Sequence, residues 1–340
     1  MNSVCQESDE LLKESMNSDC QDDSHENNIG IVDKCINDPQ LSTLNWIVFS
    51  LAMGNAADAV EICSVGFILT EIESTQREKQ FLSSSIFMGM LVGGLVSGYL
   101  SDKIGRRTCL IVSLTLNAIC GLFSSIVPDI NWLIVLRILG GIGIGGSISI
   151  VFAVGAEVFP TLTRGKLLSI IASFWMVGAI FTSATAWIML GSDYKGNKIL
   201  PGSNWRWFAM VCAIPAIVAS LLTYLCVPES PRYLIGKRQF LGASNSLNYL
   251  SNTKVNEYML QNEGTHNSPE PIRSTIQIFK QLPFELKHSF LYLIIIWFML
   301  SFGSYGISIW ISLLFQDIGE KDVYGDSFIY ALANLPGDDK

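Results

Sequence analysis

Two acidic residues, Asp58 and Glu61, lie in an otherwise apolar stretch that runs from Asn45 to Thr70 and is long enough to cross a bilayer. An ionisable side chain at that depth is costly unless it faces a cavity or a partner. Because they are three residues apart, the two carboxylates share one face of a helix. Such a pair is typical of an ion or solute site on a transport pathway. The alternative is a structural ion pair with Arg137, unless Arg137 extends to the headgroup interface instead.

Three aromatic residues, Trp175, Trp297 and Tyr305, lie in the middle of other apolar stretches. Aromatic side chains near the ends of membrane spans usually belong to an interfacial belt. In the middle of a span they can instead line a solute cavity, and for these three residues both alternatives stay open. Together with Asp58, Glu61 and Arg137 they are the candidate residues for solute or ion binding.

The composition is that of a membrane protein. Of 340 residues, 49% are hydrophobic and 15% are charged, against roughly 25% charged in a soluble domain. The net charge of −8 belongs to residues 1–40, which hold ten acids and two bases, whereas the other 300 residues carry 20 of each. This acidic segment is rich in Asn, Ser and Asp and nearly free of aromatics, so we predict that it is disordered.

Transmembrane helices are the elements that must position the candidate residues. A span needs about 20 apolar residues, and seven such runs occur, at 44–69, 81–101, 108–127, 131–154, 167–190, 206–227 and 289–315. Residues 330–335 are predicted to open an eighth span. We therefore predict an all-α polytopic membrane protein. Its predicted parts are a disordered acidic cytosolic tail (1–43), a six-span bundle (44–227), a cytosolic linker (228–287) and the start of a second bundle with one complete and one partial helix (288–340).

The charges of the connecting segments predict the orientation. If the N-terminus is cytosolic, the inside segments after the tail hold twelve Lys and Arg residues and the outside segments hold six. This bias fits the positive-inside rule. Six spans, a long polar linker and further spans also match the layout of transporters that are built from two parallel repeats.

The short loop after the second span combines Gly98, Asp102, Gly105, Arg106 and Arg107 in the pattern G-x-x-x-D-x-x-G-R-R. Gly98 would allow close helix approach, and Gly105 can take a positive φ. Asp102 can pair with a cation or cap a helix, and the two arginines can anchor the loop at the headgroups. An ordinary positive-inside loop is the simpler alternative, but it does not require this spacing.

The loop resembles the signature loop of the major facilitator superfamily. Arg137 followed by the glycines of 140–146 resembles a second motif of that superfamily, and the segment from Glu157 to Arg164 resembles a third. The sequence Pro228-Glu229-Ser230-Pro231-Arg232 resembles the P-E-S-P-R motif of its sugar-porter and organic-ion branches. The resemblance implies a gating or conformational role for Gly98, Asp102, Gly105, Arg106, Arg107, Glu157, Arg164, Pro228, Glu229 and Arg232.

A narrower resemblance is to the synaptic vesicle glycoprotein 2 branch. It rests on residues 57–61, 143–148, 174–178, 299–306 and Trp310, and it extends over residues 44–335. Relative to that branch, the chain is expected to be truncated after the N-terminal half. It therefore lacks the large lumenal domain, since residues 316–326 form only a short connector.

The resemblance implies a secondary-transporter-like protein of vesicle or plasma membranes that moves or binds a small organic solute or ion by alternating access. Two other functions stay open: a membrane scaffold or regulator of vesicle trafficking, and an inactive fragment of a longer transporter. Expected partners are the lipid bilayer and the solute. A sorting adaptor could also bind the acidic dileucine pattern of Glu7, Leu11 and Leu12.

Other classes of function have no support in the sequence. Residues 140–146 are predicted to serve helix packing rather than dinucleotide binding, because no strand precedes them. No P-loop or catalytic triad pattern occurs, and His25, His266 and His288 lie far apart in the sequence. None of the eight cysteines forms a C-x-x-C pair. We predict no cofactor, no metal site, no nucleic acid partner and no enzymatic activity.

Overall fold

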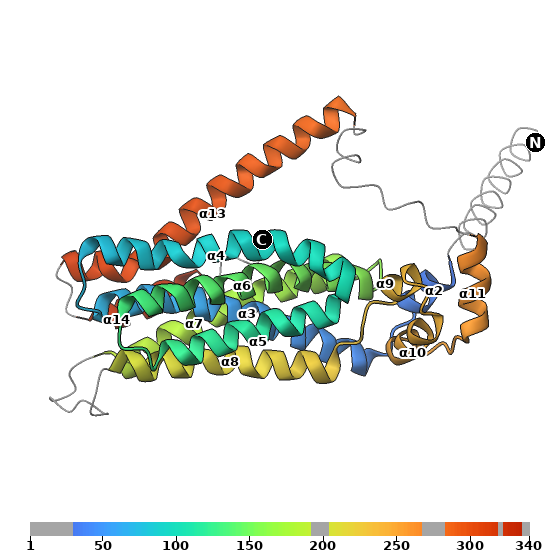
Figure 1. Cartoon of the computed structure of the whole chain (residues 1–340), viewed down its shortest axis with the longest axis horizontal. Coiled ribbons are helices and arrows are strands. Elements are labelled where there is room, and N and C mark those ends of the chain that lie inside the picture. The colour runs from blue at the N-terminus through green and yellow to red at the C-terminus, as the bar shows by residue number, and fades with distance from the viewer. Residues whose placement is uncertain (1–29, 192–203, 267–282, 319–321, 335–340) are drawn as a thin grey trace, which may run out of the picture.

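The computed structural model describes residues 30–191, 204–266, 283–318 and 322–334 (Figure 1). Seven helices among them are long and apolar enough to cross a membrane. They are α3 (Leu41–Glu71), α4 (Gln76–Ile104), α5 (Arg106–Ser124), α6 (Ile130–Val158), α7 (Arg164–Met189), α8 (Asn204–Cys226) and α13 (Phe284–Ile318). The predicted all-α polytopic fold is thereby confirmed. Residues 1–29, which include Glu7, Leu11 and Leu12, lie outside the described residues.

Helix α3 is the central element of the bundle. The most apolar part of α3 is 94% buried, and α3 packs mainly against α7 and α8. Small residues allow this central position, because Gly54, Ala56, Ala57 and Ala59 let the neighbouring helices approach closely. Asp58 and Glu61 are therefore surrounded by protein rather than by lipid.

Helices α4 and α6 are in direct backbone contact. A Cβ atom at Gly93 would overlap the backbone of Ile142, and one at Gly145 would overlap the backbone of Met90. Gly89 and Gly141 are equally restricted. This confirms the predicted packing role of the α6 glycines. The predicted close approach at Gly98 is wrong, since no atom of the described residues lies within 4 Å of a Cβ placed there.

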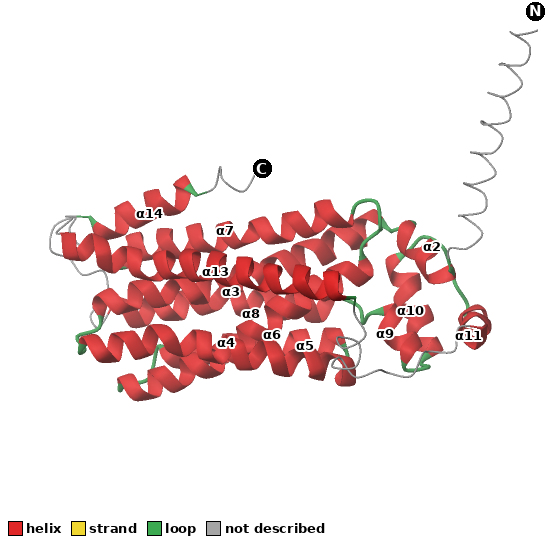
Figure 2. Ribbon diagram, turned by 90° about the horizontal axis from the view of Figure 1, so that it is seen from above, coloured by secondary structure: helices red, strands yellow, loops and turns green. Residues whose placement is uncertain are grey.

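Four short helices form a second, smaller module at one end of the bundle (Figures 1 and 2). They are α2 (Ile31–Asn37), α9 (Pro231–Gly236), α10 (Phe240–Leu250) and α11 (Glu257–His266). Their apolar side chains share a buried core that includes Cys35, Ile36, Ala243, Leu247 and Leu260. Helix α2 lies inside the segment predicted to be a disordered tail. It is ordered there because Cys35 and Ile36 are buried in this core.

Two further helices, α13 and α14, complete the described part of the fold. The C-terminal part of α13 packs on α3, where Gly66 meets the backbone of Ile309, while its N-terminal part projects away from the bundle (Figure 1). Helix α14 (Val323–Ala333) packs on α7. It begins seven residues before the predicted start at Tyr330, because the Asp322 side chain caps it by accepting from the N–H of Gly325 at 3.0 Å.

Candidate functional site

Asp58 is fully buried in α3 and is hydrogen-bonded to two other helices. The Ser147 hydroxyl of α6 donates to Asp58 Oδ2 at 2.6 Å, and the Asn117 amide of α5 donates to Asp58 Oδ1 at 3.2 Å. Asn117 is 1% exposed and Ser147 is 0% exposed. Both partners were missed in the sequence. They are single small polar residues in apolar spans, and only the packing of three helices brings them to Asp58.

Glu61 lies one helical turn from Asp58 and forms a buried ion pair with Arg137 of α6. The Arg137 side chain is 2% exposed and lies inside the bundle rather than extending to an interface. Gly121 of α5 makes room for this pair, since a Cβ atom there would lie 3.3 Å from Glu61 Oε2. The structure thus brings Asp58, Glu61 and Arg137 together, although only Glu61 pairs with the arginine.

Trp175 and Tyr305 lie in one aromatic cluster. Their ring centroids are 5.8 Å apart, and Tyr305 also packs against Phe87 at 5.6 Å. The three side chains come from α7, α13 and α4, so the cluster joins α13 to two of the first six long helices. Trp297 is not part of this cluster. It is 60% exposed on the projecting part of α13.

The loop between α4 and α5 is held by a network of charged side chains. Gly105 has φ = 103°, a conformation that strongly favours glycine. Arg106 pairs with Asp102 at 3.3 Å and with Glu157 at the end of α6 at 2.6 Å. Asp102, Arg106 and Glu157 therefore connect three helix ends.

Glu229 adds the end of α8 to this network. Its carboxylate accepts from the backbone N–H of Arg107 at 3.0 Å, close to the N-terminus of α5, where a negative charge is favourable. The Arg107 guanidinium donates to the carbonyl of Tyr224 at 2.6 Å. Tyr233 donates to the carbonyl of Lys103 at 2.8 Å. Burial, followed by the charge of Glu229, raises the pKa of Tyr233.

The other motif residues are less connected. Arg232 pairs with Asp33 of α2 at 2.6 Å, but both side chains are nearly half exposed. Arg164 donates to the carbonyl of Phe159 at 3.4 Å, which is a long hydrogen bond. Pro228 lies in the connection between α8 and α9. The structure therefore gathers Asp102, Gly105, Arg106, Arg107, Glu157 and Glu229 into one network and leaves Gly98 and Arg164 outside it.

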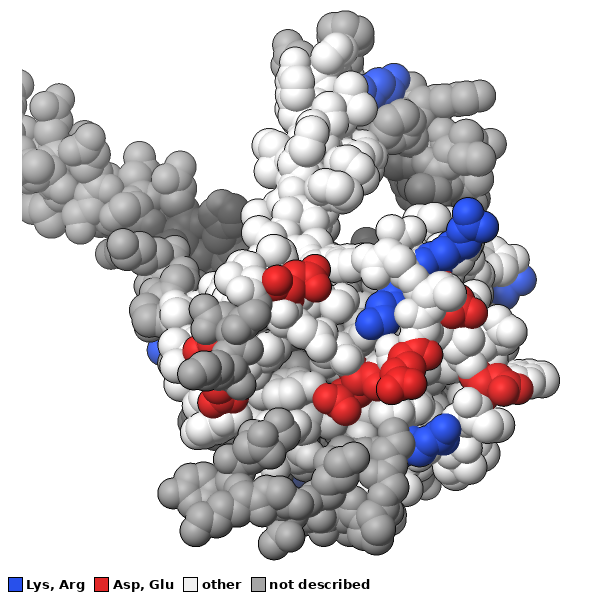
Figure 3. All heavy atoms as spheres, turned by 90° about the vertical axis from the view of Figure 1, so that its left-hand side faces the viewer, with Lys and Arg blue, Asp and Glu red and all other residues white. Residues whose placement is uncertain are grey.

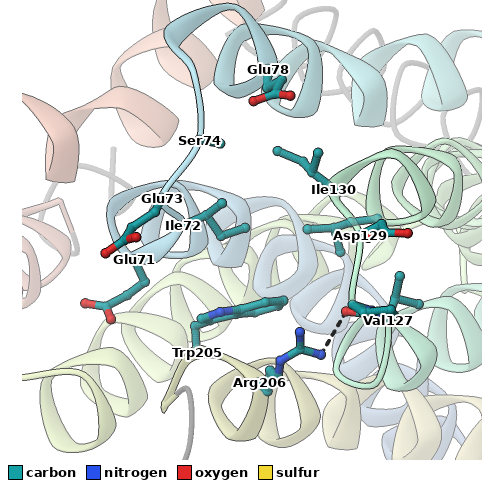
Figure 4. Close-up of a pocket in the computed structure, with 12 residues that line it drawn as sticks. Glu71, Ile72, Glu73, Ser74, Glu78, Val127, Asp129, Ile130, Trp205 and Arg206 are labelled. Carbon is teal, nitrogen blue, oxygen red and sulfur yellow. Dashed lines mark hydrogen bonds between the residues drawn. The ribbon is translucent and has the colours of Figure 1, made fainter.

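A pocket of about 370 Å³ lies at the opposite end of the bundle, and sequence reasoning did not find it (Figure 4). Its wall includes Glu71, Glu73, Glu78, Asp129 and Arg206. Acidic side chains gather on this end of the molecule (Figure 3). Three of the acids lie in the loop between α3 and α4 or beside it. The spacing of these three acids in the sequence matches neither one face of a helix nor a known motif, so it did not predict a site.

A buried ion pair at the centre of a membrane-spanning helical bundle, with a charged network at one end, is typical of secondary transporters. A family profile described as "Sugar (and other) transporter" matches residues 42–334. The chain belongs to this family, which is part of the major facilitator superfamily.

The most similar proteins include synaptic vesicle glycoproteins. Synaptic vesicle glycoprotein 2C of Mus musculus is 31% identical over 331 residues, which cover 86% of this chain and 44% of that protein. Synaptic vesicle glycoprotein 2A of Rattus norvegicus is 36% identical over 198 residues, covering 56% and 26%. The resemblance to this branch is confirmed. The chain spans less than half the length of these relatives.

Solved transporter structures share the fold. A partially occluded inward-open structure of the xylose transporter XylE from E. coli has a TM-score of 0.63 at 22% identity, covering 86% of this chain and 70% of that chain. A crystal structure of a D-xylose-proton symporter gives 0.61 at 20% identity, covering 86% and 67%. At these identities the comparison establishes the architecture of the bundle alone.

Proposed function

We propose that this chain is a secondary-transporter-like protein of vesicle membranes that binds a small organic solute or ion at the centre of its bundle. The observation that carries the proposal is the buried polar cluster of Asp58, Asn117 and Ser147, with the Glu61–Arg137 pair one turn away. Buried charge at membrane depth is costly and usually marks a pathway. A scaffold would need no such cluster inside its bundle.

The aromatic cluster lies at about the same level along the bundle axis as Asp58, where it could form an apolar wall. A Cβ atom at Gly178 of α7 would lie 2.9 Å from the Ala59 side chain, so this part of α7 packs beside the Asp58 turn of α3. Trp175 lies one turn from Gly178 and contacts Tyr305 of α13. These side chains could contact the polar and the apolar groups of one solute. We propose Asp58, Trp175 and Tyr305 as contacts of the solute.

The loop network is proposed to control access at its end of the bundle. The contacts of Arg106 with Glu157 and of Arg107 with Glu229 join the ends of α5, α6 and α8. If these ends move relative to one another during alternating access, the network must rearrange. Its charged groups are suited to this, because partly exposed ion pairs exchange partners at little cost.

The excess of Lys and Arg in the predicted inside segments supports a cytosolic N-terminus. The relatives' names refer to synaptic vesicles, which supports a vesicle membrane. A sorting adaptor that reads Glu7, Leu11 and Leu12 would direct the chain there. All three assignments belong to the proposal.

Binding to the purified 340-residue chain in detergent tests the solute site without requiring a complete transport cycle. The midpoint of thermal unfolding would be measured with a panel of sugars, organic cations and organic anions. A ligand at 100 times its Kd stabilises the folded state by about 2.7 kcal/mol. We expect at least one class of solute to raise the midpoint of the wild type and Asp58→Asn to abolish that rise.

Ser64→Ala is the matched control, because Ser64 is a buried polar residue of α3 whose hydroxyl donates only to the carbonyl of Glu61 at 2.8 Å. This variant should keep the full effect of the solute. Equal stabilisation of wild type and Asp58→Asn would remove Asp58 from the site. If no solute of the panel stabilised the wild type, the proposal of a solute site would be overturned.

A further inference from the structure

The pocket at the end of the bundle opposite the loop network has an excess of negative charge in its wall. Its lining residues carry four carboxylates and one guanidinium. Two of the carboxylates already have partners: Glu78 belongs to the capping box at the start of α4, and Glu71 accepts from the hydroxyl of Tyr324. Asp129 directly precedes α6, yet its side chain does not cap that helix. Neither Glu73 nor Asp129 forms an ion pair within the described part of the chain.

The one cationic side chain of the wall does not neutralise these acids. The Arg206 guanidinium donates to the carbonyls of Val127 at 2.8 Å and Ser125 at 3.3 Å, and its central carbon lies 4.8 Å from the ring centre of Trp205 (Figure 4). These hydrogen bonds tie the start of α8 to the loop between α5 and α6, so Arg206 holds two parts of the wall together. The carboxylates of Glu73 and Asp129 are left to attract a cation from solution.

The rest of the wall is largely apolar and aromatic. Ile72, Ile130 and Trp205 surround the pocket (Figure 4), and Leu133, which also lines it, is 2% exposed. Trp205 packs against the buried core of the bundle, which holds its ring in place. Aromatic rings attract cations as well as apolar groups. The volume of about 370 Å³ lies in the range of pockets that bind small organic molecules.

One polar group of the wall has no partner. The hydroxyl oxygen of Ser74 is shielded from solvent and forms no hydrogen bond with any described residue. A buried polar atom without a partner is costly. An N–H group of a bound ligand would satisfy the lone pairs of this oxygen, next to the carboxylate of Glu73 in the chain.

The arrangement suits an organic cation better than a metal ion. A calcium ion needs six to eight converging oxygen ligands. Within the described residues, no three His, Cys, Asp or Glu side chains come close enough together to hold a metal ion. The carboxylates of the pocket are instead distributed around an apolar space. An ammonium group on an apolar body matches that distribution.

We propose that this pocket binds a small organic cation, with Glu73 and Asp129 attracting its ammonium group and Trp205 contacting its apolar part. The site lies at one mouth of the bundle and is separate from the polar cluster around Asp58. It is formed entirely by α3, α4, α6, α8 and the loops that join the first six long helices. The inference therefore does not depend on the proposed central solute site.

Isothermal titration calorimetry of the purified 340-residue chain in detergent tests the site with three probes of similar shape. They are the phenethylammonium cation, neutral 2-phenylethanol and the phenylacetate anion. We expect only the cation to bind, and its affinity should fall as salt is added, because partly exposed charges are screened. Glu73→Gln/Asp129→Asn should raise the Kd of the cation about tenfold, since two attractive charges are lost. Trp205→Leu should raise it about threefold, and Trp205→Phe should raise it less.

Glu257→Gln/Asp317→Asn is the matched control, because it removes two exposed carboxylates that lie outside the pocket. This variant should keep the wild-type Kd. Equal Kd values for the wild type and Glu73→Gln/Asp129→Asn would overturn the site, and so would equal binding of 2-phenylethanol and the cation. Displacement of the cation by Ca²⁺ at constant ionic strength would replace the organic cation with a metal ion.

The outcome for the central site is separate. If Asp58→Asn abolished binding of the cation and Glu73→Gln/Asp129→Asn did not, the cation would occupy the centre of the bundle. That result would overturn the pocket as its site and support the proposed function. If the cation did not bind at all, the pocket would be overturned, while other solutes of the panel would still test Asp58.

Discussion

Glu61 and Arg137 form an ion pair whose side chains are 5% and 2% exposed. Removing one partner of such a pair leaves an uncompensated buried charge, which costs about 3–5 kcal/mol. Glu61→Gln should therefore lower the free energy of unfolding by about this amount. The double variant Glu61→Gln/Arg137→Gln should recover much of the loss. The measurement is equilibrium unfolding of the purified chain in detergent micelles.

The exposed residue Glu73 provides the control, since Glu73→Gln removes a carboxylate that water already solvates. It should change the free energy of unfolding by less than about 1 kcal/mol. An unfolding free energy of Glu61→Gln equal to that of the wild type would mean that the pair contributes nothing to the fold. Its role would then be purely functional.

Sequence reasoning found the charged residues of the candidate site but not their neutral partners. Asp58, Glu61 and Arg137 are conspicuous because charge is rare inside apolar spans. Asn117 and Ser147 were missed because Asn and Ser are ordinary in such spans, and their role depends on the packing of α3, α5 and α6. For Trp297 the sequence left a cavity position and an interfacial position open. Its side chain is 60% exposed on the projecting part of α13.

The contact between α4 and α6 offers a test at the level of helices. Gly93→Ala would place a methyl group into the backbone of Ile142, and overpacking of this kind typically costs about 1–3 kcal/mol. Gly98→Ala makes the same change five residues further along α4, where the described residues leave open space. Thermal unfolding in detergent should show a lower midpoint for Gly93→Ala. Gly98→Ala should be neutral or slightly stabilising, because Ala favours helix more than Gly does.

Equal midpoints for the two variants would contradict the close packing. A destabilised Gly98→Ala would have a different meaning, since it would show that a surface beyond the described residues covers that position. Both variants add the same atoms to the same helix, so the comparison cancels the intrinsic preference of alanine. What remains is the packing between the two helices.

Hydropathy predicted the long helices but did not detect the short ones. The apolar length of a membrane span can be recognised in the sequence, so the seven spans were found. Some helices extend beyond the predicted apolar runs: α13 covers Phe284–Ile318 instead of 289–315. Helices α9 and α10 lie in the polar linker. Their signals were local: Ser230 with Pro231 at the start of α9, and apolar residues at helical spacing in α10. A search for spans does not detect these signals.

At the scale of the molecule, α13 and α14 contact the first six long helices unevenly along their length. The C-terminal part of α13 contacts α3 and the aromatic cluster, and α14 contacts α7, where Trp187 stacks on Phe328 with ring centroids 5.5 Å apart. The N-terminal part of α13 is exposed along its length (Figure 1). The contacts of α13 and α14 with the other long helices thus concentrate near the end that carries the acidic pocket. The spacing of apolar residues along α13 could not predict this asymmetry, because it depends on which neighbours are present.

The two ends of the bundle also differ in charge, and this leads to a prediction of sidedness. The loop network and the short-helix module lie at one end, and the acidic pocket lies at the other (Figures 1 and 3). Since the positive-inside rule favours basic loops in the cytosol, the network end should face the cytosol. Leu162 is 97% exposed near the network end, and the exposed Asp129 lines the pocket. Leu162→Cys should react with a membrane-impermeant maleimide only from the cytosolic face, and Asp129→Cys only from the opposite face.

The measurement uses sealed vesicles of known orientation, before and after permeabilisation, which serves as the control for reactivity. The background replaces four cysteines by serine: Cys5 and Cys20, which precede the described residues, and the partly exposed Cys63 and Cys226. If both positions reacted from the same face, the two ends could not lie on opposite sides of the membrane, and the fold would not span it as described. Reversed labelling would leave the fold intact but place the loop network outside the cytosol. The positive-inside rule would then not hold for the loops of this chain. Access from the cytosol would have to be controlled at the end that carries the acidic pocket.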